Sequence, residues 1–395
     1  MNRFHLKAGY LLKKEITELY IANALRTFAI STIVIFIPIF LLKQGFSLLD
    51  VAIFFVFRSM AAFVFNYTAL RYVAKKGVKH SMLVSVPFLI AFFIGLYSIE
   101  PLRAIIGDYP LLLLLGVLEA MSAAYYYMGF HVEFARFSER KKAAEQFGIV
   151  NIFSTAFSII GPLCGALVIT YLSFNIMFVI VMLLLFFAIL PLFMSKEVHE
   201  PFDFKLNSIT GLYNMRRGMP FFAEGLRNFA ASIHWPVLMY FLFTALDSIG
   251  GVYTVSNALL VMFTMYVGHK TTDATKYRIM NIGSFLHSVT LVVRTMMKTL
   301  FSAALVQGFG AVTWPMVQLP FYSIFYNNSK KKGMSDEIHL REVYLHAGRI
   351  FSALVLAALL FHFSPVSALS LVIILGAVAT FFMARIKDEP VASGA

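Results

Sequence analysis

Long apolar stretches, each about the length of a membrane-crossing helix, alternate with short polar segments along the whole chain. A helix needs roughly 20 apolar residues to cross the hydrocarbon core of a bilayer. Twelve stretches meet this requirement. They lie near residues 19–42, 48–70, 80–98, 110–131, 146–170, 173–194, 220–244, 248–268, 278–298, 299–325, 344–363 and 366–385. The pattern therefore predicts an all-α membrane protein with 12 transmembrane helices.

Composition narrows the class of protein. The 395 residues are 59% hydrophobic and only 13% charged, whereas a water-soluble domain carries about 25% charged residues. Most of the apolar excess must therefore face lipid. The single cysteine, Cys164, excludes a disulfide framework, and the ten histidines show no metal-ligand spacing. The sequence also lacks a P-loop and a Gly-x-Ser-x-Gly motif. We therefore expect that the protein is not an enzyme and that it has no cofactor or metal site.

Positive charge is distributed unevenly between the two sides of the predicted helices. The net charge is +13, and of the 33 Lys and Arg residues 25 fall in the termini and alternate loops, three on the opposite side and five inside spans. Since cytoplasmic loops are enriched in Lys and Arg, both termini are expected in the cytoplasm and the protein in the cell (inner) membrane. Short basic clusters between apolar runs indicate membrane lipids as surroundings and no nucleic-acid partner.

The two halves of the chain repeat each other. Residues 22–31 and 223–232 agree at six of ten positions, including Leu-Arg-x-Phe-Ala, at an offset of 201. Residues 152–154 and 350–352 both read Ile-Phe-Ser, at an offset of 198. Six spans per copy give both copies the same orientation. Parallel repeats with a site at their interface are a recurring transporter architecture.

Residues 160–165, Ile-Gly-Pro-Leu-Cys-Gly, contain the Gly-Pro-x-x-Gly pattern of the major facilitator superfamily (MFS), which the sequence resembles over essentially its whole length. The resemblance implies an MFS fold of two pseudo-symmetric six-helix bundles that rock about a central cavity. The bundles would be residues 1–195 and 220–395, joined by a cytoplasmic linker, 196–219. Gly161, Pro162 and Gly165 would then have a conformational role.

The loop after the second span departs from the family pattern. Ala74 stands where the family usually has an aspartate that helps hold the two halves together at the cytoplasmic face. The basic part of the loop is retained, so Lys75, Lys76, Gly77 and Lys79 are candidate gating residues. The missing carboxylate predicts that this gate, if it operates, lacks its usual acidic partner.

Arg58 and Glu119 are expected closest to the middle of the membrane, on spans two and four. A charged side chain there costs about 2.5–3.5 kcal/mol on insertion scales, and a pair at matched depth would offset the desolvation of both. One interpretation is a charge pair that substrate or a proton can break, with Glu119 as the proton-coupling group. The other is a static pair that fixes the packing of two helices.

The repeat also duplicates an arginine. Arg26 and Arg227 lie on spans one and seven, which line the cavity in the superfamily. In one interpretation both guanidinium groups reach lipid headgroups; in the other they hold a carboxylate or phosphate across the cavity. Asn23 lies one turn before Arg26 and is a candidate substrate ligand. Glu224 lies one turn before Arg227 and is expected to neutralise it or to take part in proton coupling.

Polar residues follow one face of spans four and ten. Tyr126 shares a face with Glu119 on span four, and Gln307, Trp314 and Gln318 share a face of span ten. Such a stripe faces protein or water, so these residues are candidates for the substrate cavity, with helix packing as the alternative. The remaining ionisable residues inside spans are interpreted as interfacial anchors or packing residues: Arg294, Arg349, His234 and His287.

These features predict a monomeric secondary transporter that moves a small anionic or zwitterionic solute by alternating access. The five intramembrane arginines outnumber Glu119 and Glu224, and an anion would complement the excess positive charge. Protons, through Glu119, or another ion would drive the cycle. Efflux or translocation of amphipathic drugs or lipids by the same fold is the alternative, and a non-transporting membrane receptor or scaffold is the alternative from another class.

Overall fold

The computed structural model describes residues 14–137, 154, 156, 159–193 and 212–389, and these ranges contain helices and no strand. The first half of the chain supplies α2 (Lys14–Ser31), η1 (Val34–Phe36), α3 (Ile37–Lys43), α4 (Leu48–Lys76), α5 (Val78–Tyr97), α6 (Ile99–Ile106), α7 (Asp108–Phe137), α9 (Gly161–Tyr171), α10 (Phe174–Ile189) and η3 (Leu190–Phe193). The second half supplies α11 (Leu212–Phe229), η4 (Ala230–His234), α12 (Trp235–Phe243), α13 (Leu246–Lys270), α14 (Lys276–Arg294), α15 (Leu300–Lys332), α16 (Met334–Leu359) and α17 (Pro365–Met383).

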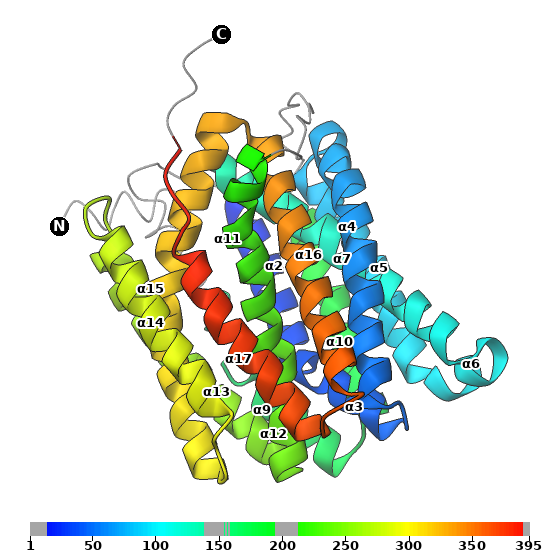
Figure 1. Cartoon of the computed structure of the whole chain (residues 1–395). Helices are drawn as coiled ribbons and strands as arrows, with labels where there is room; N and C mark the ends of the chain where they lie inside the picture. The colour runs from blue at the N-terminus through cyan, green and yellow to red at the C-terminus, as the bar shows by residue number, and fades with distance from the viewer. Residues whose placement is uncertain (1–13, 138–153, 155, 157–158, 194–211, 390–395) are drawn as a thin grey trace.

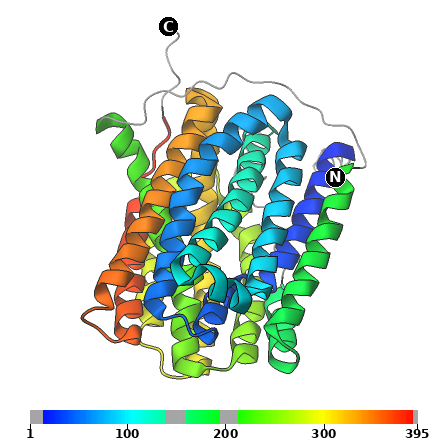
Figure 2. The same cartoon turned by 90° about the vertical axis from the view of Figure 1, so that its right-hand side faces the viewer.

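The long helices run side by side through one bundle (Figure 1). α2 begins and α17 ends at the same end of this bundle, which we call the terminal end (Figure 2). The short helix α6 and the turn between α3 and α4 lie at the opposite end, which we call the far end.

Nine of the described helices are long and apolar enough to cross a membrane. They coincide with nine of the predicted spans. The other three predicted spans are not among these nine. Of span five, predicted at 146–170, the structure describes only residues 154, 156 and 159–170, which include most of the helix α9. Span seven coincides with the broken run α11–η4–α12, and span nine coincides with α14, which is as long as α17 but less apolar. The all-α membrane fold is thus confirmed, whereas the count of twelve stays a prediction.

The first helix of each repeat copy is broken near its middle. α2 ends at Ser31 and the chain passes through η1 into α3, which has Pro38 in its first turn. In the second half, α11 ends at Phe229 and a π-helical turn leads into α12, which has Pro236 in its first turn. Proline has no amide hydrogen for the helical hydrogen bond, so both helices change geometry at these points.

Most helix contacts lie within each half of the chain. α7 packs on α4 and α5 in the first half, and α16 packs on α11 and α14 on α15 in the second. Two pairs join the halves extensively: α4 with α16, and α9 with α13. Toward the far end the halves also share an apolar core, in which the rings of Phe55 and Phe229 lie 5.5 Å apart.

Candidate functional site

Arg58 on α4 forms a two-pronged ion pair with Glu119 on α7. Arg58 Nη2 donates to Glu119 Oε1 at 2.8 Å, and Arg58 Nε donates to Glu119 Oε2. The two helices can approach closely here because Gly116 has no side chain. A Cβ atom at this position would lie only 3.0 Å from the backbone nitrogen of Arg58. The two side chains are 18% and 21% exposed. The structure therefore joins the two residues that the sequence placed at matched depth, and their role in transport stays a prediction.

Arg26 on α2 is buried among polar and aromatic side chains of the first half. Its guanidinium carbon lies 3.7 Å from the centre of the Tyr126 ring, and Nη2 donates to Ser122 Oγ at 3.4 Å. The Tyr126 hydroxyl donates to Asn23 Oδ1, and Asn23 Nδ2 donates to Ser154 Oγ at 2.5 Å. Among the described residues no carboxylate pairs with Arg26, and its Nε has no hydrogen-bond partner. In the part of the chain that the structure describes, Arg26 thus lies over an aromatic ring without a counter-charge.

Arg227 on α11 has a matching environment in the second half. Its guanidinium carbon lies 3.2 Å from the centre of the Trp314 ring on α15, and Nη2 and Nε lie 2.9 and 3.2 Å from His287 Nε2. Arginine carries only donors, so His287 Nε2 accepts and the imidazole is neutral. His287 Nδ1 then donates to Thr313 Oγ1 at 3.0 Å. His287, interpreted from the sequence as a packing residue, is fully buried, and its hydrogen bonds connect Arg227 with Thr313.

Both duplicated arginines are therefore inside the bundle. Arg26 is 6% and Arg227 8% exposed, which does not fit side chains that reach lipid headgroups. Each guanidinium group lies over an aromatic ring from the fourth predicted span of its own half. This span is α7 in the first half and α15 in the second. The repeat seen in the sequence thus corresponds to a repeated cation–aromatic arrangement.

Gln307 belongs to a contact nearer the far end. Its Oε1 accepts from Arg294 Nη2 at 2.6 Å and from Trp235 Nε1 at 3.0 Å. Arg294 is only 3% exposed, and its Nε and Nη1 have no partner in the described part of the chain. Arg294 is therefore an interior residue and not the interfacial anchor that its position predicted. Gln318 is half-buried on α15.

Seven buried or half-buried polar residues form a second layer, on the terminal side of the arginines, which we call the inter-half cluster. The members come from both halves of the chain: Asn66 on α4, His131 on α7, Glu224 on α11, Tyr322 and Tyr326 on α15, and Arg341 and Glu342 on α16.

Glu224 is the main ion-pair partner of Arg341. Arg341 Nη2 and Nε donate to the two Glu224 oxygens at 2.6 and 3.2 Å, and the Tyr322 hydroxyl donates to Glu224 Oε1 at 2.8 Å. Glu224 therefore does not form the ion pair with Arg227 that its sequence position predicted, because the start of α16 brings a closer cation. Its role in proton coupling stays a prediction.

The other members of the cluster connect the two halves. His131 Nδ1 lies 2.8 Å from the Tyr326 hydroxyl, and Arg341 Nη1 lies 3.1 Å from His131 Nε2. Asn66 Nδ2 donates to Glu342 Oε2 at 3.3 Å, and Glu342 also accepts from Arg341. Opening the bundle at the terminal end would require the contacts of His131 and Asn66 with the second half to break.

The predicted gating loop lies at the terminal end of α4. Lys75 and Lys76 are exposed, Gly77 separates α4 from α5 with a φ of 96°, and Lys79 is 4% exposed. A positive φ of this size favours glycine. The gating role of the loop stays a prediction.

Gly161, Pro162 and Gly165 place α9 directly against α2 and α13. A Cβ atom at Gly165 would overlap the carbonyl oxygen of Thr32, and one at Gly161 would overlap Ser31 Oγ. On the other side, Gly250 of α13 faces the Pro162 carbonyl. The motif therefore permits close packing both within the first half and across to the second.

Gly165→Ala is expected to destabilise the protein by about 1–3 kcal/mol, since overpacking forces the backbones apart. The measurement is the thermal unfolding midpoint of the detergent-solubilised protein. Gly251→Ala is the matched control, because a Cβ there would meet nothing within 4 Å and alanine favours helix. Equal midpoints for the two variants would contradict the packing role.

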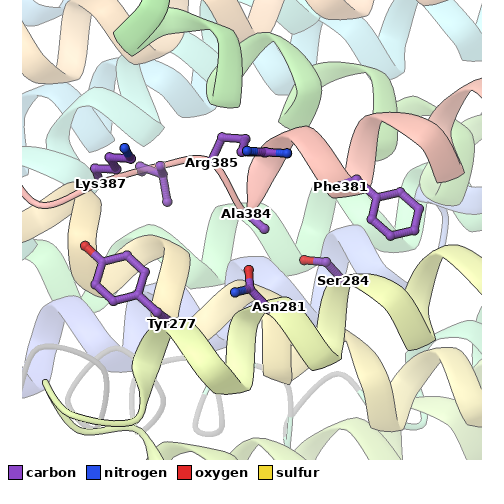
Figure 3. A pocket seen from close by; sticks show the side chains of 8 residues that line it. Tyr277, Asn281, Ser284, Phe381, Ala384, Arg385 and Lys387 are labelled. Carbon is purple, nitrogen blue, oxygen red and sulfur yellow. The ribbon is translucent and has the colours of Figure 1, made fainter.

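A pocket of about 510 Å³ lies at the terminal end, between α14 and the segment that follows α17 (Figure 3). Tyr277, Asn281 and Ser284 line it from α14, opposite Ala384 and Arg385. A second pocket, of about 10 Å³, lies between the apolar faces of the two halves toward the far end. None of the predicted site residues lines either pocket, so neither coincides with the predicted central site.

Sequence reasoning missed most of the inter-half cluster, above all His131, Arg341 and Glu342. The apolar stretch that predicts span eleven begins only near residue 344, which leaves Arg341 and Glu342 outside the predicted span. In the structure α16 begins at Met334, so Arg341 and Glu342 are already helical and buried. Helical continuity upstream of the apolar stretch was the signal that could have found them.

Solved structures with a similar arrangement of helices include MFS transporters. The chain matches the human organic anion transporter MFSD10 (TETRAN) with a TM-score of 0.62 and 11% identity, over 93% of this chain and 99% of that one. It matches the E. coli fucose:proton symporter FucP with a TM-score of 0.63 and 11% identity, over 95% and 100% of the two chains. The fold is therefore that of the MFS transporters, as the sequence resemblance implied.

Sequence comparison adds one relative. No protein-family model matches the chain. The Bacillus subtilis (strain 168) protein described as "Uncharacterized protein YqgE" is 25% identical over 336 residues, which cover 81% of this chain and 76% of the relative. The function is therefore argued from the fold and from the site residues themselves.

Proposed function

We propose that the protein is a secondary transporter that moves a small anionic or zwitterionic solute across a membrane by alternating access. The observation that carries this proposal is the set of buried arginines that have no carboxylate partner among the described residues: Arg26, Arg227 and Arg294. A buried charge without a counter-charge is costly. A bound anion would supply the missing negative charge and so compensate the cost of burying these arginines.

Arg26 and Arg227 are the proposed ligands. Each guanidinium group lies over an aromatic ring, Tyr126 or Trp314, which restricts where the group can sit. A planar fork of donors matches carboxylate and phosphate groups. The fold likeness to MFSD10, whose name describes an organic anion transporter, agrees with this class of solute.

The moving units in this proposal are residues 1–195 and 220–395, connected by 196–219. They would rotate against each other at the α4–α16 and α9–α13 contacts and expose the arginines to one side of the membrane at a time. Glu119 is the proposed proton-coupling group, because its protonation would release Arg58. The transporter would work as a monomer, with another coupling ion as the alternative to protons.

The test is solute flux and binding with the purified protein. Arg26→Gln and Arg227→Gln are each expected to weaken binding of the transported anion by about 10- to 100-fold, since a hydrogen bond to a charged group contributes about 1.5–3 kcal/mol. Thermal shifts with inorganic phosphate and a series of carboxylates would identify the anion, and counterflow in liposomes would measure its transport. Arg103→Gln is the control, because Arg103 pairs with Asp108 in a partly exposed position at the far end.

Three results would contradict the proposal. Unchanged anion binding in both arginine variants would remove these residues from the site. Transport of neutral amphiphiles, insensitive to both changes, would favour the efflux alternative. Binding without flux under any gradient would favour a receptor or scaffold.

A further inference from the structure

The His131 imidazole bridges the two halves in a single protonation state. Its ring is 5% exposed and lies between the Tyr326 hydroxyl and the Arg341 guanidinium group. Since arginine has no acceptor atom, the Arg341–His131 hydrogen bond requires an unprotonated Nε2. Nδ1 then carries the hydrogen and donates to Tyr326. The closed terminal end therefore holds His131 neutral.

The charged groups around His131 oppose a second proton in this arrangement. Arg341 occupies the position in front of Nε2 where that proton would be. Glu342 Oε1 lies farther away, at 3.7 Å from Nε2, and already accepts from Arg341. Tyr326 is the titratable group on the α15 side. The surrounding groups keep Arg341 in place: Glu224 and Tyr322 bind it, while Asn66 and His346 lie beside Glu342.

Separation of the halves would change the surroundings of His131 completely. Tyr326 and Arg341 both belong to the second half, so the imidazole would lose both partners when the terminal end opens. Arg341 would keep Glu224 and Glu342, which belong to its own half. A histidine in contact with water titrates near pH 6.5. In the open state His131 can therefore bind a second proton, whereas in the closed state it cannot.

We propose that His131 is a proton-binding site whose protonation opens the bundle at the terminal end. This inference rests on the alternating-access function proposed above. A ligand that binds only one of two conformations shifts the equilibrium toward that conformation. Because the open state binds the extra proton, acidification favours opening, and alkaline pH favours the closed state with neutral His131.

The experiment measures the separation of the halves at the terminal end as a function of pH. Spin labels at Arg71→Cys on α4 and Lys270→Cys on α13, both exposed positions, would be introduced in a Cys164→Ser background. Double electron–electron resonance in nanodiscs would then give the distance distribution between pH 8 and pH 5. In protein with histidine at position 131, the long-distance population, which reports the open state, should grow as the pH falls below about 6.5. The ratio of open to closed molecules should change by up to about tenfold per pH unit.

Three variants make the outcome specific. His131→Gln should stay closed throughout, since the amide can accept from Arg341 and donate to Tyr326 but cannot take up a proton. Tyr326→Phe should raise the open fraction at pH 8 while keeping the pH response. His362→Gln, at an exposed position near the far end, should behave like the wild type.

Two results would overturn the inference: an absence of any pH-dependent shift in the wild type, or the same shift in His131→Gln as in the wild type. If His131→Gln does not fold, the absence of a pH-dependent shift in the wild type still overturns the inference. Counterflow in liposomes separates this inference from the proposed function. Anion flux without pH-dependent opening would overturn the role of His131 alone, whereas pH-dependent opening without flux of any solute would overturn the transport proposal alone.

Discussion

Replacing Arg58 with alanine is expected to abolish solute flux and to lower the stability of the protein. The Glu119 carboxyl group would then lie between α4 and α7 without its partner. Removing one partner of a fully buried ion pair costs about 3–5 kcal/mol, and we expect a loss of up to this size from this half-buried pair. Counterflow in liposomes measures the flux, and the unfolding midpoint in detergent measures the stability. Wild-type flux in Arg58→Ala would remove the pair from the mechanism.

The double variant Arg58→Leu, Glu119→Leu separates the two interpretations of this pair. Replacing both charges with apolar side chains removes the uncompensated charge, and such replacements are often neutral or stabilising. If the pair works in transport, stability should recover while flux stays absent. Recovery of both would favour the static pair. Glu119→Gln adds a test of coupling, because it should impair proton-driven uptake more than exchange.

Replacing Glu224 with alanine is expected to have the second large effect. Arg341 is 3% exposed, and its side chain donates two hydrogen bonds to Glu224. Without this carboxylate, Glu342 would be the one remaining anion that pairs with Arg341 among the described residues, and the Tyr322 hydroxyl would lose its hydrogen bond to Glu224. We expect a loss of about 3–5 kcal/mol in stability, seen as a lower unfolding midpoint.

The matched control for Glu224→Ala is Asp108→Asn. Asp108 also pairs with an arginine, Arg103, but the two side chains are 40% and 34% exposed. Exposed ion pairs contribute about 0–1 kcal/mol, so this variant should unfold close to the wild type. Equal losses in the two variants would show that burial of the Glu224–Arg341 pair does not matter for stability.

The membrane fold could be predicted from the sequence because its main determinant is local. An apolar stretch of sufficient length predicts a membrane-crossing helix without reference to the rest of the chain. Nine of the predicted stretches coincide with described helices that are long and apolar enough to cross a membrane. The breaks in the first and seventh spans were less visible, although Pro38 and Pro236 mark them. Whether the broken helix α11–η4–α12 crosses as one span depends on packing that hydropathy does not encode.

The candidate site was predictable only where depth or repetition fixed the geometry. Arg58 and Glu119 could be paired because both lie near the middle of their spans, and the repeat singled out Arg26 and Arg227. The choice of counter-ion could not be read in the same way. Glu224 lies one turn from Arg227 on the same helix, yet it pairs with Arg341, which is distant in sequence and lies at the start of another helix.

The two ends of the bundle are closed by different kinds of contact. Toward the far end the described halves meet mainly through apolar side chains such as Phe55 and Phe229, whereas the inter-half cluster adds buried charge at the terminal end. Hydration of apolar surface carries a large positive heat capacity, and the hydrophobic contribution weakens on cooling. Opening toward the far end would therefore become easier at low temperature. Growth temperature would then help to determine which side of the membrane the cavity faces in most solute-free molecules.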